Sequence, residues 1–339
     1  MKIGRPSCHR RLALVASVAF PIVCMHSNLF AAGDFETKVT ENKSVDVTRD
    51  GVVIARFMTE HDTSTPDRHT DTFKPYLHVF DPTGAVRLTK GPGGLYPHHR
   101  GLFVGYNIIK SDGQTYDRWH MIGGDQVVHK ILTPGPGGET IAAGIEWEGT
   151  NGATLLDEER TMAFFTPPKP FYLGIDIKTS IKPPKGEAEL GGDLEHAGVQ
   201  FRPSEKIDAA KTVFLFPGEK VDVHTARDLP WVAEIMTIEG KTFTVVVLNP
   251  PDDPKGTIYS AYRDYGRFGP FVPGTAKADA PFSVHYRWLI AEGEVRDPAV
   301  FQKAWNDYAG KDLPVPALTI GSSQPRPGDP TPSPSPAQK

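Results

Sequence analysis

The chain has 339 residues, a formal net charge of −4 and no long run of basic residues. Such an acidic balance disfavours binding to nucleic acid or to an anionic membrane surface, and small neutral or sugar-like ligands suit it better. The length suffices for one large domain or for two small ones.

Residues 1–32 have the pattern of a secretory signal peptide. Several cations precede an apolar run from Leu12 to Met25, and small residues follow it. Pro21 interrupts the run, which is also shorter than the ~20 apolar residues of a membrane-spanning helix. We therefore expect export to a periplasmic or extracellular location, without a membrane span. Lipid attachment at Cys24 is an alternative that the residues before it do not favour.

Cleavage near Ala32 would remove both cysteines of the chain, Cys8 and Cys24. The mature chain would then have no disulfide, thiolate metal site or cysteine nucleophile, so a hydrophobic core must stabilise it. We interpret residues 33–320 as a single domain, because no linker-like segment interrupts them. Residues 321–339 contain six prolines and almost no apolar side chain, which predicts a disordered tail.

Short runs of alternating apolar and polar residues, separated by turn residues, fill most of this domain and predict β-strands. Val45–Phe57 has the pattern of a hairpin about Asp50-Gly51, a pair that favours a tight turn. Similar runs are Tyr76–Leu88, Ile141–Phe165, Tyr172–Ile181, Thr212–Val223, Phe243–Leu248 and Phe282–Ile290. This density of short strands predicts an all-β fold, either a sandwich or a barrel.

One helix is predicted from Asp297 to Ala309. Asp297 can cap its start, Pro298 suits its first turn and Gly310 can end it. Its apolar residues repeat at the helical spacing: Val300, Phe301, Trp305 and Tyr308. We interpret this stripe as the face of a helix packed on a sheet, not as a cofactor site.

Polar chemistry is densest at Tyr96-Pro97-His98-His99-Arg100, which follows a glycine-rich stretch. Imidazole titrates near neutral pH, so two histidines beside a cation and an aromatic ring are candidates for proton transfer. In extended backbone, His98 and His99 would point to opposite faces, and normally one of them would enter a given pocket. The sequence leaves open which one does.

Two later segments also combine a histidine with charged or aromatic neighbours. Asp117-Arg118-Trp119-His120 suits the apolar face and hydroxyl edge of a sugar, although Trp119 taken alone is more typical of a core. In Asp193–Arg202, extended alternation would place four residues on one face: His196, Gly198, Gln200 and Arg202. That face is either a ligand-binding surface or the solvated outside of a sandwich.

A fourth segment, Tyr262–Phe268, combines arginines with tyrosines. Arg263 and Arg267 could hold a carboxylate or hydroxyl groups in bidentate fashion. A surface ion pair with Asp264 is the alternative for either arginine.

In this order, the four segments resemble those of the bacterial PmoA-like family, a domain of otherwise unknown function named after methane oxygenase PmoA. The resemblance extends from Val45 to Gly293. It is carried by Tyr96–Phe103, Trp119-His120, His129, His196–Arg202 and Tyr286-Arg287. A membrane methane monooxygenase needs several spanning helices, and the mature chain offers none, so we reject methane oxidation.

The resemblance implies an antiparallel sandwich like that of galactose mutarotase and several polysaccharide lyases and hydrolases. The fold expected is thus all-β, a large antiparallel β-sandwich of the supersandwich kind with a short C-terminal helix. The function expected is that of an exported carbohydrate-active enzyme, a hydrolase, lyase or epimerase, acting on a small-molecule or glycan ligand.

In this hypothesis, His98 or His99 shares proton transfer with His196. Glu195 would orient a group or act as a base, and Arg100 would stabilise developing negative charge. The remaining candidates would hold the substrate: Tyr96, Trp119, His120, Gln200, Arg202 and Arg263.

No cofactor is required by these roles. A divalent metal held by His99, His120 and His196, with Glu195, is a variant, although the sequence lacks the i, i+4 histidine spacing of a helical zinc site. Two other classes stay open, a non-catalytic glycan-binding module and an envelope structural protein. The oligomeric state is not predicted.

Overall fold

The computed structural model describes residues 1, 35–132 and 139–323. Apart from Met1, the expected signal peptide lies outside the described residues, and so does nearly all of the expected tail. The strand β21 (Leu318–Ser322) pairs with a neighbouring strand, so regular structure continues two residues past the predicted start of that tail.

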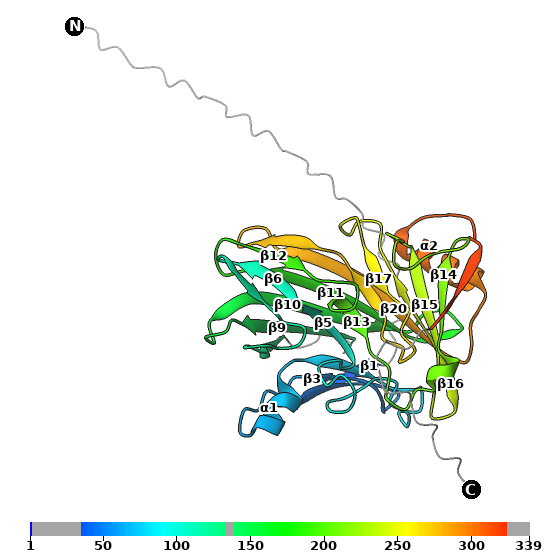
Figure 1. Cartoon of the computed structure of the whole chain (residues 1–339), viewed down its shortest axis with the longest axis horizontal. Helices are drawn as coiled ribbons and strands as arrows, with labels where there is room; N and C mark the ends of the chain where they lie inside the picture. Colours follow the sequence, from blue (N-terminus) through cyan, green and yellow to red (C-terminus); the bar gives the residue numbers. More distant parts are fainter. Residues whose placement is uncertain (2–34, 133–138, 324–339) are drawn as a thin grey trace.

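Two large antiparallel sheets face each other and form the body of the molecule, as Figure 1 shows. The six-stranded sheet has the order β1 (Phe35–Thr40), β2 (Ser44–Arg49), β3 (Val52–Met58), β4 (Tyr76–Val79), β5 (Leu102–Tyr106) and β13 (Ala197–Phe201). The nine-stranded sheet has the order β21, β14 (Val213–Pro217), β15 (Trp231–Ile238), β16 (Lys241–Leu248), β20 (Phe282–Glu292), β11 (Phe171–Lys182), β10 (Thr154–Phe165), β9 (Thr140–Glu148) and β8 (Gln126–Leu132).

Smaller elements complete the fold. A four-stranded sheet has the order β19 (Gly274–Lys277), β12 (Glu187–Gly191), β6 (Ile108–Ser111) and β7 (Gln114–Tyr116). A two-stranded sheet joins β17 (Ile258–Ser260) to β18 (Gly269–Phe271). The helices are α1 (Pro66–Thr72), α2 (Pro298–Ala309) and a short 3₁₀ turn, Ala209–Lys211. The prediction of an all-β, antiparallel sandwich with a short C-terminal helix is confirmed.

The main core lies between the two large sheets. Val47 and Leu77 reach it from the six-stranded sheet, and Ile145, Ile175 and Trp288 reach it from the nine-stranded sheet. In β9, buried and half-buried residues alternate along the strand, as expected when one face of a sheet covers a core. Burial of apolar surface at roughly 25 cal/mol per Å² is the main force that holds the sheets together.

Local sequence signals correctly placed one hairpin and one helix. Asp50 and Gly51 take left-handed φ angles of 52° and 77° between β2 and β3, the geometry of a tight hairpin turn. In α2, the Asp297 carboxylate accepts a hydrogen bond from the Ala299 N–H at 2.9 Å, and Gly310 ends the helix at φ 62°. Its Phe301 packs with Trp231 on the outer face of the nine-stranded sheet.

Two local predictions differ from the structure. In the predicted run Thr212–Val223, residues 218–223 do not form the second strand of a hairpin. The strand β14 pairs instead with β15 and β21. The helix α1 was not predicted, because its seven residues include a single apolar side chain, that of Pro66. Among the described residues, no helix is both long and apolar enough to cross a membrane.

The packing of α2 can be tested at Trp305, which is 7% exposed and donates a hydrogen bond to the Asn249 carbonyl at 2.7 Å. Replacement by Ala should lower the free energy of unfolding by ~3–5 kcal/mol, because it leaves a cavity and an unpaired carbonyl. Urea denaturation measures this loss. Lys303→Ala, on the exposed face of the same helix, should change it by less than ~0.5 kcal/mol. Equal losses in the two variants would contradict the packing described.

Candidate functional site

The four segments with concentrated polar residues meet over one face of the β5–β13 pair. Gly105 of β5 is the register partner of Gly198 of β13. A Cβ at Gly105 would lie 2.8 Å from the Arg118 carbonyl oxygen, and one at Gly198 would lie 2.1 Å from that of Pro270. The two glycines therefore let the Asp117–His120 loop and the strand β18 approach this face closely.

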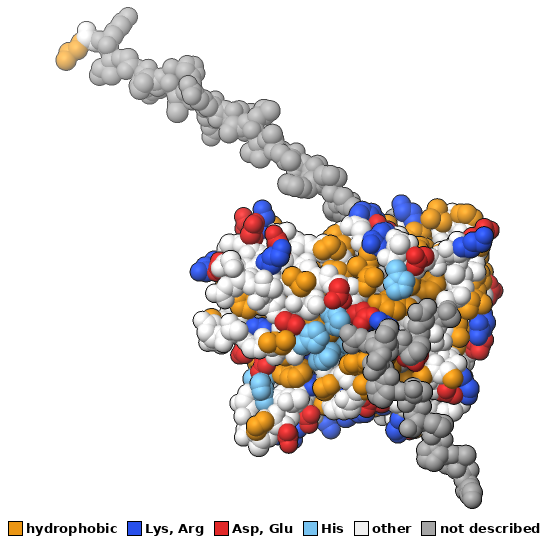
Figure 2. Space-filling view, in the orientation of Figure 1, with side chains coloured by type: hydrophobic (Ala, Val, Ile, Leu, Met, Phe, Trp, Pro, Cys, Tyr) orange, Lys and Arg blue, Asp and Glu red, His pale blue; other side chains and the backbone are white. Residues whose placement is uncertain are grey.

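Four histidine rings form a row over this face. The ring centroids of His98 and His99 are 4.4 Å apart, those of His98 and His120 are 4.4 Å apart, and those of His120 and His196 are 5.1 Å apart. We call these four residues the histidine row. Figure 2 shows histidine side chains grouped at the middle of one face of the molecule, where Figure 1 draws β5 and β13.

His98 and His99 reach the same cluster, contrary to the expectation for extended backbone. Tyr96 has a left-handed φ of 53°, and the His99 N–H donates to the Tyr96 carbonyl at 2.9 Å. The segment is therefore a turn, in which neighbouring side chains do not alternate between opposite faces. His98 is half-buried, whereas His99 lies below it at 3% exposure, against the ring of Trp119.

Two members of the row are held by an aspartate three residues earlier in the chain. The Asp117 carboxylate lies 2.7 Å from Nδ1 of His120, and the Asp193 carboxylate lies 2.7 Å from Nδ1 of His196. Each aspartate also accepts a hydrogen bond from a backbone N–H of its own loop. When Nδ1 donates to the carboxylate, Nε2 keeps its lone pair and can accept a proton.

Asp117 and Asp193 were assigned no role on the basis of the sequence. The signal that could have marked them is the spacing Asp-x-x-His, which occurs in both the second and the third polar segments. A short polar side chain that bonds to the backbone a few residues ahead forms a compact turn. Such a turn holds the carboxylate and the following imidazole in one place.

Burial keeps three members of the row, His98, His99 and His196, neutral. It lowers the pKa of His98 to about 2 and the pKa of His99 well below its usual value, with the charge of nearby cations acting in the same direction. Burial also lowers the pKa of His196, although Asp193 opposes this effect. These three imidazoles therefore carry no charge near neutral pH.

Glu195 is held by residues of the fourth polar segment, Tyr262–Phe268. Its carboxylate accepts hydrogen bonds from the Tyr262 hydroxyl at 3.0 Å and from Nε of Arg263 at 2.8 Å. Burial raises the pKa of Glu195, but the hydrogen bonds from Arg263 and Tyr262 and the positive charge of Arg263 together outweigh burial, so the pKa is lowered. Glu195 is thus an ionised partner of Arg263, which fits the predicted orienting role better than that of a base.

Arg100 does not face the histidine row, so its predicted part in catalysis is not supported. The side chain is 0% exposed, and its three nitrogens donate to the carbonyls of Thr70, Asp71 and Pro97. Two of these carbonyls belong to the last turn of α1, where a cation stabilises the helix end. Arg100 therefore joins α1 to the loop that carries His98.

Three predicted substrate contacts, Trp119, Gln200 and Arg202, are also buried, and their side chains contact other parts of the protein. Trp119 is 0% exposed and packs with Phe103 and Tyr76, so its ring is not available as a sugar platform. Gln200 bonds to the Ala197 carbonyl and to Arg267. Arg202 donates to the carbonyls of Pro203 and Tyr265. Of the predicted contacts, Tyr96, His120 and Arg263 remain at least partly exposed.

Arg267 lies beneath the row with much of its hydrogen-bonding capacity unused. One Nη donates to the Gln200 side chain at 2.9 Å, and the guanidinium carbon is 5.7 Å from the Trp119 ring centroid. Its Nε and Nη2, both ring nitrogens of His99 and Nε1 of Trp119 are buried without a protein partner. Buried polar atoms in proteins are normally paired, so this group of unpaired atoms makes the layer beneath the row unusually polar.

The metal site that we considered as a variant, with His99, His120 and His196 as ligands, does not fit the row. Among the described residues, the group of ligand atoms close enough to hold an ion is His61, His69 and Asp125, which lies outside the row. His99 is too deeply buried beneath Tyr96 and Trp119 to share an ion with the two aspartate-held histidines without moving.

A cavity of about 200 Å³ lies beside α1 and is lined by Arg68, Lys74, Tyr76, His78 and Arg87, among others. Tyr76 also packs with Phe103 and Trp119, and Lys74 donates to the Trp119 carbonyl at 2.7 Å. The cavity is therefore separated from the histidine row by these buried side chains. We place the candidate site at the row, because the polar loops converge there.

A family model matches residues 44–306 of the chain, and its description is a family of unknown function, DUF6807. The chain belongs to this family. A search of the curated proteins finds no significant match. The PmoA-like resemblance remains a prediction.

Two solved structures illustrate the likeness at the level of the fold. An aldose epimerase homologue from C. elegans has 6% sequence identity and a TM-score of 0.36, with 77% of this chain and 99% of that chain covered. A polysaccharide lyase has 10% identity and a TM-score of 0.33, with 78% of this chain and 33% of that chain covered.

The structural role of Arg100 can be measured directly. Arg100→Ala should lower the free energy of unfolding by ~2–5 kcal/mol, because three carbonyls lose their buried donors. Chemical denaturation of this variant should be compared with that of Arg296→Ala, whose arginine is exposed and pairs with Glu294 at the surface. Full stability of the Arg100 variant would show that its guanidinium is not the structural link described.

The neutral state of His98 has a consequence for acid stability. Its pKa is lowered to about 2 from an ordinary 6.5, so below pH 6.5 the unfolded chain binds a proton that the folded chain does not. This histidine therefore makes stability fall as the pH drops from 6.5 towards the folded pKa. In His98→Asn, the decline should be shallower by up to about 1.4 kcal/mol per pH unit. Parallel curves of unfolding free energy from pH 6.5 to about pH 4 would contradict it.

Proposed function

We propose that this protein is an exported carbohydrate-active enzyme that removes a proton from a sugar carbon. An epimerase then returns a proton to the opposite face of that carbon, whereas a lyase forms a double bond as the leaving group departs from the neighbouring carbon and takes up a proton. The observation that carries the proposal is the pair of aspartate-held imidazoles, those of His120 and His196, whose ring centroids are 5.1 Å apart. Export rests on the signal-like sequence of residues 1–32.

The two aspartate-held histidines suit general base and general acid roles. Each has Nδ1 occupied by a carboxylate, which orients the ring and stabilises the imidazolium that forms when Nε2 accepts a proton. Both rings are partly exposed, at 31% for the His120 side chain and 17% for that of His196. A proton taken by one ring can therefore be returned by the other, or by water, at the opposite side of a bound sugar carbon.

The carboxylates of the site favour this chemistry over glycoside hydrolysis. Glycosidases commonly use two carboxyl groups that are free to act on the glycosidic bond. Here Asp117 and Asp193 are bound to imidazoles, and Glu195 is bound to Arg263 and Tyr262. Histidine is thus the group best placed to move a proton, and a lyase or an epimerase fits better than the hydrolase also considered.

A buried positive charge beneath the row supports the same reaction class. Removal of a proton next to a carbonyl or carboxylate group leaves negative charge on oxygen, which a fixed cation stabilises. Arg267 is 0% exposed, so little water screens its charge. The positive charge of Arg267 also lowers the pKa of His98, although burial and the charge of Lys74 have larger effects. Arg267 therefore takes the electrostatic role first given to Arg100.

Aromatic side chains at the rim suit the apolar face of a sugar ring. Tyr96 is half-buried, and its ring centroid lies 5.3 Å from that of Tyr265 and 5.3 Å from that of His99. Rigid aromatic rings offer contact area at a small entropy cost. Tyr96 is thus the best aromatic contact for a ligand in the site, in place of the buried Trp119.

Solvent exchange tests the proposal whatever product the reaction yields. Uronates, aldoses and oligosaccharides that contain them are incubated with the protein in D₂O, and NMR follows loss of a carbon-bound proton signal. His196→Gln should reduce the exchange rate by about 10²–10⁴-fold, because the proton acceptor is removed. His285→Gln is the matched control, since His285 also pairs with a carboxylate, that of Asp253 at 2.8 Å, but lies outside the row.

A non-catalytic glycan-binding module is the second candidate, and the partly exposed Tyr96 favours it. In that case a sugar binds to the wild type and to His196→Gln with similar affinity, as measured by calorimetry, and no exchange occurs with either. Exchange that persists unchanged in His196→Gln would show that His196 is not the proton carrier.

A further inference from the structure

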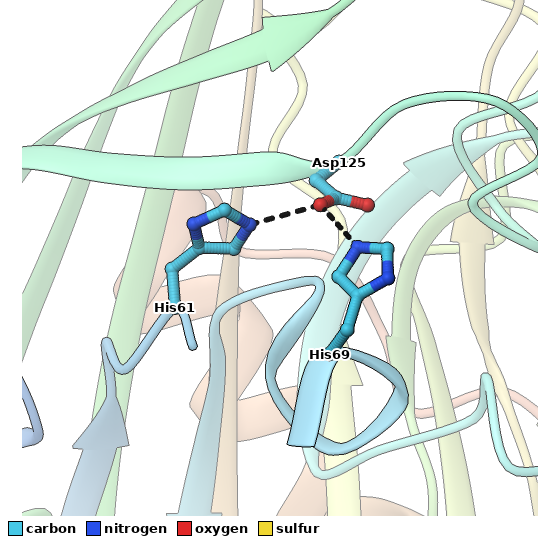
Figure 3. Close-up of side chains that lie close together, drawn as sticks. All are labelled: His61, His69 and Asp125. Carbon is cyan, nitrogen blue, oxygen red and sulfur yellow. Dashed lines mark hydrogen bonds and ion pairs between the residues drawn. The ribbon is translucent and has the colours of Figure 1, made fainter. Parts of the chain in front are cut away.

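A second histidine–carboxylate cluster lies outside the histidine row. His61 follows β3, His69 lies in α1 and Asp125 immediately precedes β8. One Asp125 oxygen is 2.9 Å from Nε2 of His61 and 2.6 Å from Nε2 of His69. Figure 3 shows both rings directed at this oxygen. None of these residues stood out in the sequence, because they lie up to 64 positions apart.

The spread of these atoms matches the first coordination shell of a metal ion. The three ligand atoms all lie within 4.8 Å of one another. Bonds of 2.0–2.2 Å to nitrogen and oxygen put neighbouring ligand atoms roughly 3–3.5 Å apart in a tetrahedral or octahedral shell. The two distances to the Asp125 oxygen are slightly shorter than this, so small outward movements of the imidazoles would admit an ion.

The surroundings hold the carboxylate in place and leave one side accessible. The Asp125 side chain is 8% exposed, whereas those of His61 and His69 are 23% and 43% exposed. The Asp125 N–H donates to the Glu148 carboxylate at 3.4 Å, and the Glu148 N–H donates to the Asp125 carbonyl at 2.9 Å. The Asp125 carboxylate is buried and its backbone is anchored, whereas the two histidines lie towards solvent. An ion bound here would therefore have room for water or a further ligand on its solvent side.

We propose that His61, His69 and Asp125 form a binding site for a divalent transition metal ion, with zinc as the ion of best fit. Two imidazole nitrogens and one carboxylate oxygen are ligands that zinc accepts, and iron(II) and manganese(II) accept the same set. Calcium and magnesium are disfavoured, because they prefer oxygen ligands. The simpler alternative is that both imidazoles only donate hydrogen bonds to Asp125.

An ion at this position would connect α1 to the segment that leads to the candidate site. Asp125 is the last residue of the stretch that begins with Asp117 and contains His120. The side chain of the next residue, Gln126, donates a hydrogen bond to the Arg118 carbonyl at 3.4 Å. Arg100 binds the carbonyls of the two residues that follow His69 in the same helix, Thr70 and Asp71. The ion would thus hold α1 and the His120 loop together, next to the residues of α1 that Arg100 binds.

Metal titration distinguishes the two possibilities. The purified protein is stripped with a chelator, dialysed and titrated with Zn²⁺ by calorimetry, and bound metal is counted by mass spectrometry. We expect one zinc ion per chain at this site, and a rise in melting temperature of about 5 °C at a hundredfold excess over Kd. His69→Gln and Asp125→Asn should each weaken binding by about 100-fold or more and abolish the rise.

Three comparisons make the result decisive. His69 is the most exposed of the three ligands, so His69→Gln should fold normally even if Asp125→Asn does not, and circular dichroism checks this. His285→Gln, which removes a histidine paired to a different carboxylate, should bind zinc like the wild type. The proposal would be overturned if the wild type bound no zinc, or if His69→Gln bound zinc with unchanged affinity. It would also be overturned if zinc binding were lost in His196→Gln instead. Zinc binding can hold whether or not the histidine row is catalytic.

Discussion

The pairing of β5 with β13 is the constraint on which the candidate site depends. These strands are more than ninety positions apart in the chain, yet their register places Gly105 opposite Gly198. Because neither residue has a side chain, the backbone of the Asp117–His120 loop and that of β18 can lie directly on the sheet. The histidines carried by three separate loops then reach one another over a single face.

Cations bound to backbone carbonyls hold these loops in position. Arg100 ties the His98 turn to α1, Arg118 donates to four carbonyls around the Asp117 loop, and Arg202 bonds to the Tyr265 carbonyl. A guanidinium carries five donors in a fixed plane, so one side chain can satisfy several carbonyls of irregular backbone. Buried arginine near a candidate site is therefore as much a sign of loop architecture as of ligand binding.

The outer layer of the site has a different chemistry from its floor. Asp117 and Asp193 orient two partly exposed imidazoles, while Arg267 and His99 lie beneath them with unused polar atoms. Carboxylate-oriented imidazoles above a fixed positive charge form an arrangement suited to accept a proton and to stabilise the anion left behind. The separate group of His61, His69 and Asp125 has charge and geometry suited to an ion rather than to proton transfer.

By itself, the sequence determined the all-β class, the Asp50-Gly51 hairpin and the capped helix α2, because periodicity and turn chemistry act over a few neighbouring residues. It also marked the four polar segments by their local composition. The tertiary structure alone decided which side chains of those segments are partly exposed at the histidine row and which are buried beneath it. Arg100, Trp119 and Arg202 have the polarity or shape of site residues, but their orientation depends on carbonyls and rings supplied by distant parts of the chain.

The same reason explains what the sequence did not indicate. His61, His69 and Asp125 have no shared spacing, since α1 and the start of β8 are brought together by the packing of elements far apart in the chain. Likewise, His98 and His99 share one cluster because a turn with left-handed backbone at Tyr96 replaces the extended strand that their sequence permits. Local patterns specify elements, whereas contacts between distant elements specify a site.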